Sequence, residues 1–212
     1  MPLNLGNITN DVSDDIVDLE FEDAYVRYIE ADHQFMNFMN AIEIAEKAKA
    51  AQSTECVSFA EELLGCSLEV LKDRDEEEKR VSNNLIGSTN AAFSSIRGYI
   101  SFIFGRCIKN KALRARLNKE TVTDIKGKKV SVMDALVSTQ AELNHFDDKR
   151  REIISRNTTK SGFRQIQDIH SDFQDQFSKF YTSRGREDIA YFIREARRIL
   201  KVAKKIVKEY IH

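Results

Sequence analysis

The amino-acid sequence predicts an all-α fold, a multi-helix bundle of about six or seven helices. The chain has eight glycines and one proline among 212 residues, which leaves little turn chemistry for a β fold. Glu, Lys, Arg, Ala and Leu are abundant and favour helices. Apolar side chains also recur in steps of three and four along most of the chain. We expect a flexible N-terminal tail over residues 1–12 and a single helical domain over residues 13–212.

A long first helix is expected to begin at Ser13, whose hydroxyl can cap a helix with Asp14 and Asp15 in its first turn. No helix breaker interrupts the apolar spacing before about residue 51. The apolar face of this helix would be formed by Phe21, Tyr25, Tyr28, Phe35, Met39 and Ile42.

Two further helices are expected before residue 110. Thr54 can cap the first of them, and the charged block KDRDEEEKR is interpreted as its solvated end. Its inner stripe would consist of Val57, Ala60, Leu64, Leu68 and Leu71. The next helix, over about residues 84–108, has a broad apolar face that favours a central position in the bundle. That face comprises Ile86, Phe93, Ile96, Ile100, Ile103 and Phe104.

Residues 121–132 change from helical to alternating spacing, with β-branched residues on both sides of a Lys-Gly-Lys turn. This pattern predicts a short hairpin or ordered loop, a possible insertion over residues 120–132. It does not match a phosphate-binding loop, because the upstream glycine is missing and Lys129 stands where Ser or Thr is required. Ser131 and Asp134 resemble a capping box that opens the following helix.

The two C-terminal helices are expected to form an antiparallel hairpin with a coiled-coil-like seam. The first covers residues 163–181, and the second covers residues 187–211 with heptad spacing of its apolar residues. We expect this seam to carry helix packing and self-association, with His170 packed as a neutral side chain in a row of phenylalanines. The seam residues are Phe163, Ile166, His170, Phe173, Phe177, Ile189, Ala196, Ala203 and Tyr210.

The charges are polarised along the chain, although the net charge is -1. Residues 1–55 carry twelve acidic and three basic side chains, whereas residues 184–212 carry nine basic and four acidic ones. A basic face on the last helix is formed by Arg194, Arg197, Lys201, Lys204, Lys205 and Lys208. This face could be solvated or pair with the acidic first helix, dock onto an acidic subunit or partner, or bind nucleic acid or an anionic membrane. Tyr191 is the single aromatic residue among these bases, which argues against a dedicated nucleic-acid binder.

Two Glu-x-x-His spacings, Glu30 with His33 and Glu142 with His145, occur in the chain. Di-iron carboxylate bundles use two such pairs with glutamates from two other helices. At about 100° per residue, however, all four side chains fall outside the apolar faces of their helices. We therefore expect no metal site and no cofactor here.

His170 lies six positions after Arg164, with five residues between them. This spacing resembles that of HEPN-family ribonucleases, all-α bundles in which the Arg and His act together on RNA. The resemblance implies a catalytic role for both residues. It covers these two residues alone, and Gln165 stands where Asn or His is usual in that family. On a continuous helix the two side chains would point about 120° apart.

Three cysteines without a Cys-x-x-Cys pair, and an N-terminus without the features of a signal peptide, predict a cytoplasmic protein with reduced thiols. The function predicted from these observations is that of a non-enzymatic helical assembly or interaction protein. It would act through helix packing and charge-complementary docking, with itself or another protein as the partner. The alternatives are the HEPN-like ribonuclease and a nucleic-acid or membrane binder that uses the basic helix.

Overall fold

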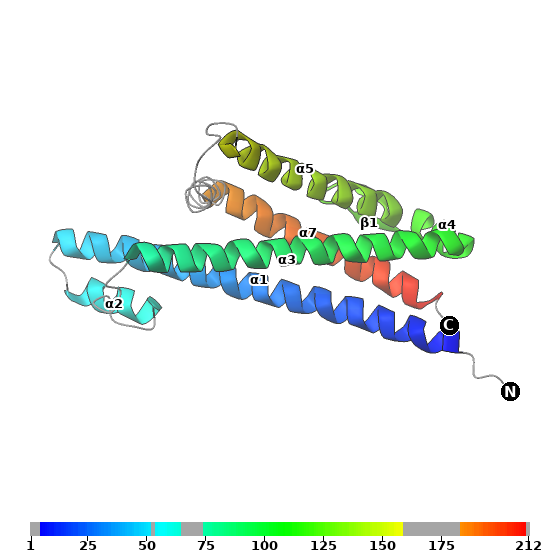
Figure 1. Cartoon of the computed structure of the whole chain (residues 1–212), viewed down its shortest axis with the longest axis horizontal. Helices are drawn as coiled ribbons and strands as arrows, with labels where there is room; N and C mark the ends of the chain where they lie inside the picture. The colour runs from blue at the N-terminus through cyan, green and yellow to red at the C-terminus, as the bar shows by residue number, and fades with distance from the viewer. Residues whose placement is uncertain (1–4, 52–53, 65–73, 159–182, 211–212) are drawn as a thin grey trace. The chain divides into compact units, whose positions relative to one another are not determined.

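The computed structural model describes residues 5–51, 54–64, 74–158 and 183–210, and within them the fold is all-α (Figure 1). Six helices and a two-stranded antiparallel sheet make up these ranges, as the sequence predicts. The helices are α1 (Leu5–Ala51), α2 (Thr54–Leu64), α3 (Arg74–Lys109), α4 (Lys111–Lys119), α5 (Val132–Thr158) and α7 (Ser183–Lys208). The strands are β1 (Thr121–Thr123) and β2 (Lys129–Ser131).

Two helix starts differ from the prediction. Helix α1 begins at Leu5, inside the expected tail, so Ser13 is not its first cap. Helix α3 begins at Arg74, so most of the charged block opens this helix and does not close the second one. Oppositely charged side chains three or four residues apart support a helix, and the pair Glu77–Arg80 is one example.

The hairpin and the serine cap of the predicted capping box are confirmed. In the hairpin Val122 pairs with Val130, and Gly127 turns the chain with a φ of 76°, which a glycine adopts without strain. The Asp134 backbone N–H donates to Ser131 Oγ at 3.0 Å, and the Ser131 hydroxyl donates to Asp134 Oδ2 at 2.7 Å. These contacts fix where α5 starts relative to the hairpin.

The contacts within the chain group into two compact units, one of residues 1–23 and 92–212 and one of residues 24–91. In the second unit Phe38, Ile42 and Val81 form a buried cluster with Phe35 packed against it. Asn84 of α3 also donates a hydrogen bond to the Gln34 side chain of α1 at 3.1 Å. A single domain over residues 13–212 stays a prediction.

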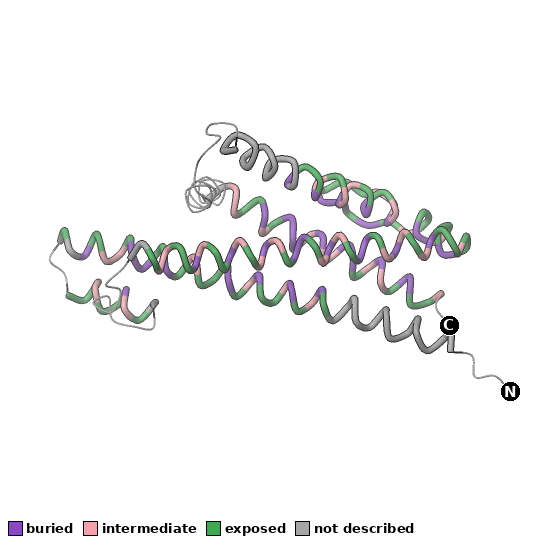
Figure 2. The backbone as a smooth tube through the Cα atoms, viewed as in Figure 1, coloured by how far each residue is buried: buried purple, intermediate pink, exposed green. Residues whose placement is uncertain are grey.

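The first unit is built around α7. Helices α4 and α5 contact it, and so does β1. Three rings from different helices, those of Phe93, Phe146 and Phe192, meet with centroids 5.3 to 5.6 Å apart. Figure 2 shows buried and exposed positions alternating along α7, as expected of a helix with one face in the core.

The expected apolar face of α1 is correct at three positions and wrong at Met39. Phe21, Tyr28 and Ile42 are buried, whereas Met39 is exposed. The remaining buried positions are mainly alanines, which the sequence reading did not assign to the face. Small side chains allow close approach of a neighbouring helix, so alanines can line a packed face as well as larger residues do. These buried alanines are Ala24, Ala31, Ala41 and Ala48.

Candidate functional site

The apolar face of α7 is buried in the chain itself. Ile189, Ala196 and Ala203, the seam residues predicted on this helix, have at most 1% of their surface exposed. The buried face also includes Ile193, Leu200 and Val207, so it is wider than a heptad seam. Tyr210 follows the end of α7 in a turn and is partly buried, which corrects the helix end expected at residue 211.

The other half of the predicted seam lies outside the described residues. This applies to Phe163, Ile166, His170, Phe173 and Phe177. Arg164, which with His170 forms the HEPN-like spacing, also lies outside the described residues. A catalytic role for these two residues therefore stays a prediction.

The basic face of α7 is directed away from its buried face. Arg194, Lys201, Lys205 and Lys208 are exposed, and their positions fall within an arc of about 60° around the helix. Arg197 and Lys204 lie at the edge of this arc and are partly buried. The six basic residues therefore divide into an exposed row of four and a flank of two.

One carboxylate of the first helix engages this face. Glu22 accepts hydrogen bonds from Arg197 Nε at 3.1 Å and from an Arg197 terminal nitrogen at 2.6 Å. The Lys201 ammonium lies 3.6 Å from the other Glu22 oxygen. The acidic first helix and the basic last helix therefore pair at Glu22, as one of the interpretations of the basic face expects.

A second group of basic residues was missed in the sequence reading. Residues 106–131 carry nine basic side chains and two acidic ones, a signal that counting charge in short windows would have found. Arg116 pairs with Glu120 at 2.7 Å. Helix α4 contacts α7 and β2, and β1 contacts α7. Ten bases of α4, the hairpin and α7 are exposed: Lys111, Arg114, Lys119, Lys126, Lys128, Lys129, Arg194, Lys201, Lys205 and Lys208.

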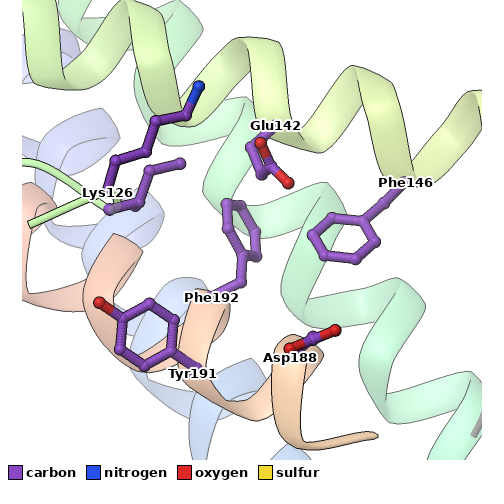
Figure 3. Close-up of a pocket in the computed structure, with 7 residues that line it drawn as sticks. Lys126, Glu142, Phe146, Asp188, Tyr191 and Phe192 are labelled. Carbon is purple, nitrogen blue, oxygen red and sulfur yellow. The ribbon is translucent and has the colours of Figure 1, made fainter. Parts of the chain in front are cut away.

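A pocket of about 330 Å³ opens between the hairpin, α5 and α7. Ile125, Phe146 and Phe192 are almost fully buried and form its apolar part. Figure 3 shows the lining residues Glu142 on α5 and Asp188 and Tyr191 on α7. Lys126 of the hairpin turn completes the lining.

The polar groups of this pocket do not neutralise one another. Among the described residues, no ion pair joins the Lys126 ammonium to the carboxylate of Glu142 or Asp188. Glu142 is partly buried, whereas Asp188 and Lys126 are exposed. The lining therefore carries two negative charges and one positive charge beside three aromatic rings.

Three of the four residues in the two Glu-x-x-His pairs lie on the surface. Glu30, His33 and His145 are exposed, as expected from their helical positions. Glu142 was expected on the outside and instead lines the pocket, because the hairpin and α7 cover that side of α5. Nowhere in the described ranges do three His, Cys, Asp or Glu side chains come close enough together to hold a metal ion.

No described helix combines the length and the apolar character needed to cross a lipid bilayer. No family model, curated protein or solved structure matches the chain.

Proposed function

We propose that the chain is a non-enzymatic helical interaction protein that docks onto an acidic protein surface through the basic face of α7. The contact of Arg197 and Lys201 with Glu22 carries this proposal, because here the face already accepts a carboxylate from another helix. Arg194, Lys205 and Lys208 continue the same row and are exposed. A partner with a row of carboxylates would extend this pattern of pairing.

The partner that the charges favour is a second copy of the chain. Residues 1–55 carry nine more acidic than basic side chains, twelve against three, and residues 184–212 carry five more basic than acidic ones, nine against four. The acidic part of one copy could therefore attract the basic helix of another. Such a contact joins different surfaces of the two copies, which makes it a heterologous interface.

Coiled-coil pairing of residues 163–181 with α7 also belongs to this proposal. The burial of Ile189, Ala196 and Ala203 supports a packing role for the apolar face of α7. Because that face is occupied within the chain, docking would use the outward charges rather than the apolar residues. We expect this interaction to depend on salt, since exposed charges are largely screened beyond about 10 Å at 0.1 M salt.

The mass of the protein in solution tests the proposal. At low salt, light scattering should give a mass above 24.4 kDa that rises with concentration and falls as salt is added. The triple variant R194E/K205E/K208E should remain at the monomer mass. The control K79E reverses an exposed lysine of α3, outside the basic face, and should behave like the parent protein. A parent protein of 24.4 kDa at every concentration in low salt would contradict the proposal.

A nucleic acid or an anionic membrane is the second candidate partner, favoured by the excess of basic residues over positions 106–131. Binding of labelled single-stranded RNA, duplex DNA or phosphatidylserine vesicles at low salt would support this candidate. Reversal of Lys111, Arg114 and Lys119 should then abolish binding. If the parent protein binds none of the three probes, the candidate is excluded.

We also propose a cytoplasmic location. A reducing compartment suits a chain that has three cysteines and no Cys-x-x-Cys pair.

A further inference from the structure

The pocket between the hairpin, α5 and α7 has a lining that the proposed docking of the basic face does not use. Its apolar part is formed by Ile125, Phe146 and Phe192, and its polar part by Glu142, Asp188 and Lys126. The three elements that form it all belong to the unit of residues 1–23 and 92–212.

The size of the pocket restricts its occupant. Ligand sites in proteins span roughly 300–1,000 Å³, and this pocket of about 330 Å³ lies at the lower end. It suits one long side chain better than a nucleotide or another large cofactor. The apolar part can cover the methylene stem of such a side chain, as protein surfaces commonly do for lysine and arginine.

The charges of the lining favour a cation. Glu142 and Asp188 face the pocket from two different helices, and Lys126 supplies one compensating charge (Figure 3). A partly buried carboxylate such as that of Glu142 is costly unless it is paired. A cationic group placed between the two carboxylates would remove this cost and leave the pocket close to neutral with Lys126 in place.

The aromatic residues favour a guanidinium over an ammonium. In the structure the Arg194 guanidinium carbon lies 5.5 Å from the centroid of the Tyr191 ring, so this ring already accepts a guanidinium. A planar guanidinium can stack on a ring and donate to two carboxylates at once, whereas an ammonium acts as a point charge.

We propose that this pocket receives the side chain of an arginine of a partner protein. The stem packs on Phe146 and Phe192, and the guanidinium lies between Glu142 and Asp188. Arginine is enriched among the residues that dominate protein interfaces, and it anchors best in pockets that exclude water. This pocket would bind a cationic group of a partner, whereas the basic face of α7 would bind carboxylates. The two interactions are therefore distinct.

Binding of capped amino acids to the full chain tests this assignment. Nα-acetyl-arginine amide is titrated against the protein and followed by NMR shifts of the amides around Tyr191. It should bind at least tenfold more tightly than the citrulline analogue, which has the same shape without the charge. The lysine analogue should bind with intermediate affinity.

Two substitutions in the pocket should weaken the binding of the arginine analogue, and a third should tighten it. Glu142→Gln and Asp188→Asn should each weaken arginine binding by about tenfold, since each removes one charge-assisted contact with the guanidinium. Lys126→Ala should tighten it severalfold by removing a like charge. Glu209→Gln is the control, because Glu209 is exposed, lies beyond the end of α7 and does not line the pocket.

The substitutions at positions 142 and 188 preserve side-chain shape, and circular dichroism confirms that each variant is folded. Equal affinity for arginine and citrulline would overturn the proposal. So would unchanged affinity in both Glu142→Gln and Asp188→Asn, or the absence of shifts at millimolar arginine analogue. None of these outcomes depends on whether the protein self-associates, so this test and that of the basic face can fail separately.

Discussion

At Glu22 a single carboxylate joins two positions of α7 that are one turn apart, Arg197 and Lys201. Arg197 uses two nitrogens, which gives the pair a defined geometry as well as charge attraction. The side chains of Glu22 and Arg197 are 33% and 28% exposed, so water screens this pair less than it screens pairs on the open surface.

A double-mutant cycle of Glu22→Gln and Arg197→Met should show a coupling free energy of about 1 kcal/mol, at the upper end for partly exposed pairs. Urea unfolding of the four proteins measures it, and the coupling should shrink in high salt. The exposed pair of Glu43 and Lys47, four residues apart on α1, is the control and should show a smaller coupling. Strict additivity at Glu22 and Arg197 would show that their contact does not stabilise the fold.

Cys107 provides a second test at the residue scale. Burial raises the pKa of its thiol, and the nearby Arg114 guanidinium opposes this shift only in part. Since the thiolate is the reactive form, iodoacetamide should modify Cys107 at least about tenfold more slowly than the exposed Cys56. The measurement uses a Cys66→Ser background and mass spectrometry of the labelled peptides. In concentrated guanidinium chloride the two rates should become equal, whereas equal rates in the folded protein would contradict the burial.

At the scale of single elements, the start of α5 depends on Ser131. Its hydroxyl oxygen accepts the backbone N–H of Asp134 in the first turn of the helix. Ser131→Ala should therefore lower the free energy of unfolding by about 1 kcal/mol, and Ser131→Asn should restore most of it. The control Ser138→Ala makes the same change within α5, beyond its first turn, where alanine is the better helix former. Equal effects at the two positions, measured by urea unfolding, would show that the cap does not stabilise α5.

The existence of the helices could be predicted from the sequence more reliably than their ends. The hairpin at residues 121–132 and the Ser131 cap are local features, since each depends on residues within a few positions of one another. The start of α3 was missed because a block of charges is compatible with a solvated end as well as with a helix held by pairs such as Glu77–Arg80. The start of α1 was missed because Ser13 can cap a helix but does not have to begin one.

The apolar spacing of α7 predicts which residues are buried but underestimates the width of the buried face. Its heptad positions are buried as expected, but Ile193, Leu200 and Val207 are buried as well. A heptad pattern in the sequence is shared by coiled-coil seams and by helices with a wider buried face. Only the three-dimensional structure shows that α4, α5 and β1 contact this helix.

At the scale of the whole molecule, a net charge of -1 conceals an acidic N-terminal part and a basic C-terminal helix. The basic face of α7 could be predicted because its residues recur on one side of a single helix. The pocket could not, because Ile125, Glu142 and Asp188 come from three elements that only the fold brings together. No local spacing in the chain relates these three positions.

Helix α7 buries its apolar face within the chain, and we propose that its outward bases dock onto the acidic part of a second copy. Zero-length carbodiimide cross-linking of a mixture of ¹⁴N- and ¹⁵N-labelled protein tests this docking, because it joins only amines and carboxylates in contact. We predict mixed-isotope links from Lys201, Lys205 or Lys208 to acidic residues of positions 1–55 at low salt, and their loss at high salt. Links from these lysines that occur only within one copy would contradict the claim.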